Sequence, residues 1–318
     1  MAAYLIKFFF GVIILLLATQ LFVKLAVKLS EVFRLSPLVI GMLVVSFGTT
    51  LPELSVSITS SSSGSVGLAA GTILGSTIVN FILVLPAAIL LGKDIRIGTT
   101  KTQKNAMVLI IATILFVLLQ QLPIPPFVSG LILLFGLLIS NYLEYRWGAL
   151  GRLQEDKTVI DLFKKRKITP DLIFGLFFSV ICVTVGGLLV VRSMEDLAVI
   201  SGYSTTVLGL TLTGIATSLP DIFTAVMSQK KDEDKLTIGH ITGGSLYNLL
   251  FIGGVTNVLG ADMNLGITET LFLFGTVFLF LLIIRFYKDK NIPKWVGLVL
   301  LLIFFLYIYT TSFLGKNF

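Results

Sequence analysis

Ten long apolar runs, separated by short charged or turn-forming stretches, dominate this sequence. They cover approximately residues 4–28, 37–60, 66–91, 105–121, 126–147, 170–192, 203–229, 236–259, 266–286 and 293–314. A helix needs about 20 apolar residues to cross a bilayer, which is roughly the length of each run. Only 13% of the residues are charged, against about 25% in soluble domains, which is too few to cover a water-facing surface. The sequence therefore predicts an integral membrane protein.

The secondary structure of the runs follows from the properties of lipid. Backbone groups in a bilayer must satisfy their own hydrogen bonds, which leaves helices or a closed barrel. The ten-residue alternating segments of a barrel are missing. We therefore expect an all-α protein with ten transmembrane helices, and the 318 residues leave no room for a separate soluble domain.

Basic residues are distributed unevenly between alternate connections of these ten helices. One side receives 21 of the 24 Lys and Arg residues, and the other receives Lys7, Arg192 and Lys316. Because basic loops stay in the cytoplasm, this bias predicts that both termini lie on the outer side of the cell membrane. We interpret the net charge of +7 as an orientation signal, so we expect no nucleic-acid partner.

The chain consists of two similar halves, residues 1–147 and 169–318, joined by a basic stretch at 148–168. Gly-Thr-Thr-Leu-Pro-Glu at 48–53 matches Ala-Thr-Ser-Leu-Pro-Asp at 216–221, which lies 168 positions later. Each half has five spans, an odd number, so the second half must enter the membrane from the opposite side. We expect two inverted-topology five-helix repeats with a cytoplasmic linker.

Glu53 and Asp221 are predicted to lie near the middle of spans, at equivalent positions of the two halves. An ionised carboxylate at the bilayer centre costs about 2.5 to 3.5 kcal/mol. Because no Lys or Arg occurs in the central turns of the neighbouring spans, we expect a cation from solution to offset both charges. The alternative is a pair of protonated carboxyls that hydrogen-bond Asn80 and Asn248 for packing alone.

Further polar residues surround each acid at helical spacing and therefore share its helix face. Pro52 and Pro220 directly precede the acids and are expected to loosen their helices, which frees backbone carbonyls. The resulting donors are all oxygens. The candidate ligands are Ser46, Thr49, Thr50, Glu53, Ser76, Asn80, Gly214, Thr217, Ser218, Asp221 and Asn248.

Two glycine pairs stand on the Asn-bearing spans, Gly71 with Gly75 and Gly239 with Gly243. Small residues at this spacing are typical of close helix packing, which is how we interpret them. Such packing would bring the Asn-bearing helices against the acid-bearing ones at the midplane.

A ligand set of oxygens indicates hard cations. Calcium accepts six to eight flexible oxygens, whereas transition metals favour nitrogen or sulfur. Two carboxylates balance one Ca²⁺ or about two Na⁺, so a site that holds either load can exchange one for the other. With Cys182 and His240 as the single residues of their types, the chain has neither a disulfide framework nor a zinc site of protein ligands. We expect no cofactor and no enzymatic activity.

At these residues the sequence resembles the cation/calcium antiporter superfamily, specifically its Na⁺/Ca²⁺ exchanger branch. The similarity covers both signature segments, about 48–81 and 214–249, and the ten-helix layout extends it to nearly the whole chain. The resemblance implies that Glu53 and Asp221 are the central ligands shared by Ca²⁺ and Na⁺, with the other candidates beside them. It also implies that the first and sixth helices slide as a pair across a static core.

The sequence departs from the family pattern at Gly244 and His240. Gly244 stands where the family usually has Ser, so the second half lacks one hydroxyl. His240 follows the Gly-Asn position of relatives, and we interpret it as a polar residue at a helix end rather than as a group that tunes the pH response. Asn248 resembles potassium-independent exchangers, because potassium-dependent relatives tend to carry an acid there.

Three other functions compete with Na⁺/Ca²⁺ exchange. A proton/Ca²⁺ exchanger is the alternative, because two carboxyls could carry protons, although those relatives usually have Gly-Asn-Ala-x-Glu in place of Thr-Leu-Pro-Glu. An intramembrane protease would need two catalytic Asp residues or a Ser with His, whereas here one Asp is paired with a Glu. A channel is disfavoured by inverted repeats with broken helices, which are typical of alternating access. We expect a monomeric, electrogenic Na⁺/Ca²⁺ antiporter whose partners are Ca²⁺, Na⁺ and the lipid bilayer.

Overall fold

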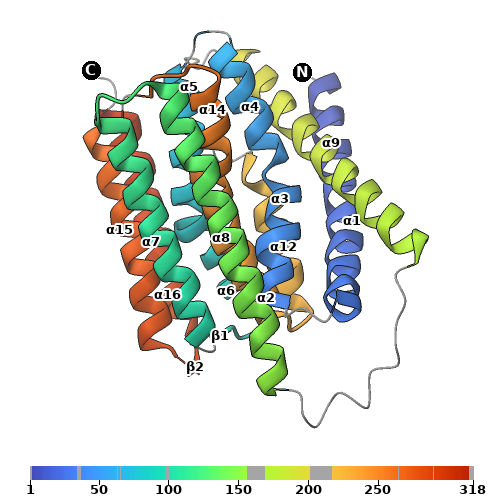
Figure 1. Ribbon diagram of the computed structural model, residues 1–318. Coiled ribbons are helices and arrows are strands. Elements are labelled where there is room, and N and C mark those ends of the chain that lie inside the picture. The colour runs from blue at the N-terminus through green and yellow to red at the C-terminus, as the bar shows by residue number, and fades with distance from the viewer. Residues whose placement is uncertain are drawn as a thin grey trace.

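Helices make up nearly all of the described chain in this computed structural model (Figure 1). The described residues are 2–33, 37–62, 64, 66–97, 100–155, 169–200, 217–263, 265–288 and 290–314. In chain order the helices are α1 (Ala2–Phe33), α2 (Pro37–Ile40), η1 (Gly41–Val45), α3 (Ser46–Thr49), α4 (Leu51–Ser62), α5 (Val66–Val79), η2 (Asn80–Val84), α6 (Leu85–Leu91), α7 (Thr100–Gln121), α8 (Pro126–Glu155), α9 (Pro170–Ile200), α12 (Leu219–Lys230), α13 (Asp234–Leu246), η4 (Tyr247–Ile252), α14 (Gly253–Val258), α15 (Ile267–Phe286) and α16 (Lys294–Leu314). Two short strands, β1 (Arg96–Ile97) and β2 (Lys290–Asn291), pair antiparallel.

The helices coincide with the predicted spans wherever the structure describes the chain. Within that part, seven helices are long and apolar enough to cross a membrane, and the pair Leu38–Thr49 and Leu51–Ser62, bent by 43°, makes an eighth. Residues 203–216 of the predicted seventh span lie outside the described residues, and α12 is its second part. The expectation of an all-helical membrane protein is confirmed.

The two halves of the chain run through the bundle in opposite directions. Helix α1 begins and α16 ends at the same end of the bundle (Figure 1). Helices α1 and α9, which open the two halves, lie side by side, but α1 runs away from that end and α9 runs toward it. This arrangement is the one that two inverted repeats require.

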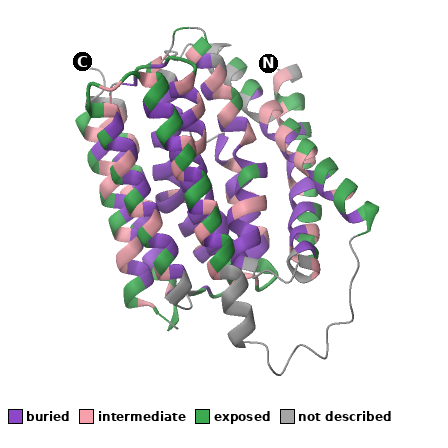
Figure 2. Cartoon of the chain, in the orientation of Figure 1, coloured by how far each residue is buried: buried purple, intermediate pink, exposed green. Residues whose placement is uncertain are grey.

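Large apolar side chains cover the outward faces of the bundle. Exposed residues follow the outer sides of the peripheral helices, and buried residues fill the interior (Figure 2). Phe174 of α9 and Phe286 of α15 are 71% and 72% exposed. In water such faces would be an aggregation liability, whereas in a bilayer they contact lipid.

The buried apolar side chains form two clusters rather than one. The smaller cluster is built mainly from α1 and α9, and the larger one unites most of the remaining helices. Where α1 and α9 cross, a Cβ on Gly186 would come within 2.9 Å of the Leu15 nitrogen. A Cβ on Gly187 would stand 3.2 Å from Cγ of Pro220 and 3.3 Å from Cγ of Pro52. The α1–α9 pair therefore packs as a unit across both halves.

A set of hydrogen bonds, here called the polar clamp, ties three connections together at the end of the bundle that carries the strands (Figure 1). The Arg96 backbone N–H donates to Asp234 Oδ2 at 3.1 Å, and Gln229 Nε2 donates to the Asp94 carbonyl at 3.0 Å. Asn291 Nδ2 donates to Asp94 Oδ2 at 3.2 Å. The clamp joins the connections that follow α6, α12 and α15.

Candidate functional site

The framework of the site is a broken helix in the first half and the equivalent start of α12 in the second half. Thr50 interrupts the chain between α3 and α4 with φ −83° and ψ 1°. Ser218, at the equivalent position 168 residues later, has φ −79° and ψ −2° and immediately precedes α12. Each break lies two residues before a proline, Pro52 or Pro220. The prediction that these prolines loosen their helices is confirmed for Pro52, where the two helices are bent by 43°, and the chain from 201 to 216 that would show it for Pro220 lies outside the described residues.

The two acids lie just beyond these breaks, in the first turn of α4 and of α12. Glu53 is 0% exposed and Asp221 is 1% exposed. A helix N-terminus carries a partial positive charge from its unpaired N–H groups, which stabilises a nearby carboxylate. The start of each helix therefore favours the ionised form of the acid that it carries.

Among the described residues, three π-helical segments flank the site, and no sequence pattern predicts them. Segment η1 ends directly before Ser46, η2 begins at Asn80, and η4 contains Asn248 as its second residue. A π-turn inside an α-helix is rare and occurs frequently at functional sites. The apolar pattern of these segments is the same as that of an α-helix, so no sequence signal distinguishes them.

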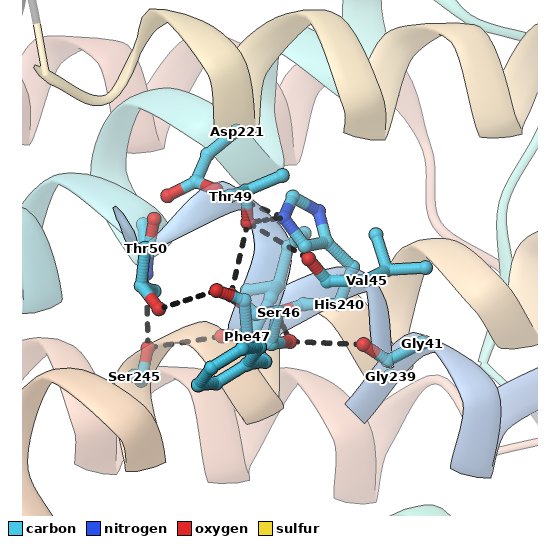
Figure 3. A network of polar contacts seen from close by, with 12 residues as sticks. Gly41, Val45, Ser46, Phe47, Thr49, Thr50, Asp221, Gly239, His240 and Ser245 are labelled. Atoms are coloured by element: carbon cyan, nitrogen blue, oxygen red, sulfur yellow. Dashed lines mark hydrogen bonds and ion pairs between the residues drawn. The ribbon is translucent and has the colours of Figure 1, made fainter. Parts of the chain in front are cut away.

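His240 joins the two halves at the centre of the site (Figure 3). Its Nε2 atom lies 2.9 Å from Asp221 Oδ1 and 3.0 Å from Thr49 Oγ1. The His240 and Asp221 side chains are 1% and 2% exposed. The expectation that His240 is a polar residue at a helix end is therefore wrong, because it lies in the middle of α13 and contacts two candidate ligands.

Close helix packing places His240 at the centre of the site. A Cβ on Gly239 would come within 2.2 Å of the Leu38 carbonyl oxygen, and one on Gly243 within 2.4 Å of Ser46 Oγ. Helix α13 therefore lies directly against the segment from α2 to α3. Ser46 Oγ, which donates to the His240 carbonyl at 2.9 Å, adds a polar contact between the halves.

The packing interpretation holds for the second glycine pair and not for Gly75 of the first. A Cβ on Gly75 would have Tyr307 Oη as its nearest neighbour among the described residues, at 3.8 Å. No backbone approaches Gly75 closely within that part of the chain. The two repeats therefore use equivalent glycines differently.

All the candidate ligands that the structure describes are buried. They are Ser46, Thr49, Thr50, Glu53, Ser76, Asn80, Thr217, Ser218, Asp221 and Asn248. Asn80 Nδ2 donates to Ser245 Oγ on α13 at 3.4 Å, and Thr50 Oγ1 donates to the Phe47 carbonyl at 3.3 Å. Gly214 lies outside the described residues.

Several side-chain oxygens of these ligands are buried without a hydrogen-bond partner among the described residues. They are both Oε atoms of Glu53, Oδ2 of Asp221, Oγ of Ser76, and Oδ1 of Asn80 and of Asn248. A buried polar group left unpaired costs about 1 to 3 kcal/mol. These oxygens belong to two carboxyl groups, one hydroxyl and two amides, which are the ligand types that hard cations prefer.

Sequence reasoning missed a third buried carboxyl group, Glu144 of α8, which is 2% exposed. Ser140 Oγ donates to Glu144 Oε1 at 3.3 Å. One residue after Ser140, Asn141 Nδ2 donates to the Tyr247 hydroxyl at 3.3 Å. The closely spaced polar residues Ser140, Asn141 and Glu144 are the signal that could have revealed a buried polar face near the end of this span.

Several known proteins are similar to this chain in sequence and in fold. The model of the sodium/calcium exchanger protein family matches residues 3–145 and 172–313. A putative antiporter, CaxA of Alkalimonas amylolytica, is 27% identical over 307 residues, which cover 94% of this chain and 95% of that protein. The sodium/calcium exchanger MaX1 of Methanosarcina acetivorans is 22% identical, over 92% of this chain and 94% of its own.

A solved structure of the sodium-calcium exchanger NCX_Mj superposes with a TM-score of 0.80 at 26% identity, covering 98% of each chain. The fold is thus that of a transporter, and the two segments matched by the family correspond to the two repeats. The chain belongs to the sodium/calcium exchanger family of the cation/calcium antiporter superfamily.

Proposed function

We propose that this protein exchanges Na⁺ for Ca²⁺ across the membrane by alternating access, with Glu53 and Asp221 as the central ligands. The observation that carries the proposal is the group of buried, unpaired oxygens on Glu53, Asp221, Ser76, Asn80 and Asn248. These residues are among the ligands that the sequence singles out, and they come from both repeats.

The charge and number of these oxygens suit the exchange. Calcium takes six to eight oxygens at about 2.3 to 2.6 Å. The unpaired side-chain oxygens, together with backbone carbonyls at the helix breaks, can supply that number. Because Glu53 and Asp221 carry two negative charges when ionised, either one Ca²⁺ or two Na⁺ neutralise them. The two loads compete for the same ligands, which is the physical basis of antiport.

Polar side chains continue from the site toward both ends of the bundle. Ser57 lies one turn beyond Glu53 on α4, and Thr224 and Ser228 lie one and two turns beyond Asp221 on α12. All three are fully buried, and their hydroxyls have no partner within the described chain. Because α4 and α12 run in opposite directions from their acids, these hydroxyls suit two access paths. Sliding of the α1–α9 pair would open one path at a time.

The orientation and partners follow from the same proposal. We expect both termini outside the cell, the linker 148–168 in the cytoplasm, and a monomer as the transport unit. The substrates are Na⁺ and Ca²⁺, and neither a cofactor nor a nucleic acid takes part.

Reconstituted vesicles test the proposed exchange directly. Vesicles loaded with Na⁺ and diluted into Na⁺-free medium should take up ⁴⁵Ca²⁺, and the substitutions Glu53→Gln and Asp221→Asn should abolish that uptake. Each substitution removes one of the two central charges and leaves the shape nearly unchanged. The matched control is Asp262→Asn, at an exposed residue of the connection after α14, which should transport normally.

The same vesicles discriminate the proton-coupled alternative. If a proton gradient drove ⁴⁵Ca²⁺ uptake and a Na⁺ gradient did not, the proposal of Na⁺ coupling would be wrong. Uptake that survives both carboxylate substitutions would instead show that the site lies elsewhere.

A further inference from the structure

The His240 ring occupies ligand positions of the proposed ion site. Its Nε2 atom is 2.9 Å from Asp221 Oδ1 and 3.0 Å from Thr49 Oγ1 (Figure 3). These two oxygens come from different repeats, so the nitrogen stands where a cation bridging the repeats would stand. At the equivalent position the first half has Thr72.

The hydrogen-bond partners determine which atom carries the proton. An ionised Asp221 carboxylate only accepts hydrogen bonds, so the Nε2 atom of His240 must donate. The Thr49 hydroxyl donates its own proton to the carbonyls of Val45 and Ser46, both at 3.2 Å. Its lone pair is then free to accept, and one Nε2–H is shared between Asp221 Oδ1 and Thr49 Oγ1.

The other ring nitrogen of His240 is not anchored on any described residue. Histidines that ligate metals almost always anchor their second nitrogen on a carboxylate, a carbonyl or water. The Nδ1 atom of His240 is buried and has no hydrogen-bond partner among the described residues. The ring is therefore held through Nε2, the atom that faces the site, and Nε2 is occupied.

We propose that the His240 N–H permanently fills one cation position of the site, so that the protein exchanges two Na⁺ for each Ca²⁺ without net charge movement. The proposal rests on the proposed Na⁺/Ca²⁺ exchange. The partial positive charge of the N–H takes the place of a cation between Thr49 and Asp221. The oxygens that remain unpaired, on Glu53, Asp221, Ser76 and the two Asn residues, then hold the transported ions.

The number of Na⁺ ions exchanged per Ca²⁺ is measured under conditions where the net Ca²⁺ flux is zero. Vesicles with a fixed Na⁺ gradient are clamped at different membrane potentials with K⁺ and valinomycin, and the Ca²⁺ ratio at which net ⁴⁵Ca²⁺ flux vanishes is recorded. For the wild-type protein this ratio should follow the square of the Na⁺ gradient and not respond to potential. The substitution His240→Thr, which installs the residue of the first half, should free a position for a third Na⁺. The balance ratio should then shift tenfold for about 59 mV, the value for one net charge.

The control variant alters α13 without reaching the site. Thr242 is fully buried, and its hydroxyl donates to the carbonyls of Ile238 and Gly239 in its own helix. Thr242→Val should therefore keep the potential-independent balance of the wild type. A wild-type balance that shifts with potential, or an unchanged ratio in His240→Thr, would overturn the proposal.

A second measurement does not depend on transport. His240 is the single histidine of the chain, so protein with ¹⁵N-labelled histidine gives one imidazole in an NMR spectrum. We expect the Nε2-protonated form in Na⁺ and in Ca²⁺ alike, with His240→Thr as the blank. Loss of the Nε2 proton on loading with either ion would overturn the proposal. If a Na⁺ gradient fails to drive Ca²⁺ uptake, the exchange proposal falls, and the spectrum still decides whether the N–H holds its position.

Discussion

At Gly244 the two halves of the site differ by a single hydroxymethyl group. Its counterpart 168 positions earlier is Ser76, whose hydroxyl is buried and unpaired within the described chain. A Cβ on Gly244 would have Asn80 Nδ2 as its nearest neighbour, at 3.3 Å. A side chain added at this position would therefore reach toward the site, and it requires only a small shift of the Asn80 amide.

The substitution Gly244→Ser should add one hydroxyl ligand to the second half. One new contact of hydrogen-bond strength contributes about 1 kcal/mol to Na⁺ binding. We therefore expect the Na⁺ concentration for half-maximal ⁴⁵Ca²⁺ exchange to fall about fivefold. Flux assays over a Na⁺ titration measure the change. Gly275→Ser is the control, because Gly275 of α15 has open space around its Cα. An unchanged or weakened Na⁺ dependence would show that position 244 does not face the ions.

Local patterns in the sequence indicate most of the candidate site but not His240. The ligands around Glu53 and Asp221 could be predicted because they repeat at helical spacing in both halves. His240 appears once, and its partners Asp221 and Thr49 are 19 and 191 positions away. Only the close packing of α13 on η1 and α3, which depends on tertiary structure, brings them together.

At the scale of elements, Gly187 of α9 lies against the prolines that precede both acids. A Cβ on Gly187 would be 3.2 Å from Pro220 and 3.3 Å from Pro52, tighter than usual carbon contacts. Any sliding of the α1–α9 pair must carry this glycine past both prolines. The break before Pro52 was predictable from the proline, whereas the π-segments were not, because apolar periodicity does not report an extra residue in one turn.

The substitution Gly187→Ala should slow transport without removing a ligand. An added methyl group in a tightly packed contact costs about 1 to 3 kcal/mol. If about 1.4 kcal/mol of this cost raises the barrier between the two access states, the transport rate falls tenfold. Initial rates of Na⁺-driven ⁴⁵Ca²⁺ uptake measure this, with Ca²⁺ affinity expected to stay constant. Gly275→Ala, at a position with no neighbour within 4 Å, provides the comparison. Equal rates in both variants would contradict a sliding contact at Gly187.

For the whole molecule, the basic connections and the two termini lie at opposite ends of the helix bundle. The two termini of the helix bundle share one end, and the polar clamp with its basic connections occupies the other (Figure 1). The apolar runs, their number and the basic bias were readable from the sequence because insertion into lipid depends on local composition. The separation of the core into two clusters was not, because it depends on which helices touch.

Cysteine labelling tests the proposed orientation. In a Cys182→Ser background, Gln121→Cys lies at the last residue of α7 and Lys288→Cys in the turn after α15, and both positions are exposed. A membrane-impermeant maleimide added to intact cells should label the first variant, and the second only after permeabilisation. Labelling in the reverse order would show that the basic connections face outward.

In the proposed transport cycle, the polar clamp would belong to the static part of the protein. It fastens together the connections after α6, α12 and α15, all of which belong to helices of the larger apolar cluster. Helices α1 and α9 supply none of the residues of the clamp. If the α1–α9 pair slides as proposed, the contact of Lys231 Nζ with the Gln20 carbonyl of α1 at 3.2 Å must break, whereas the ligands on the clamped helices would keep their geometry.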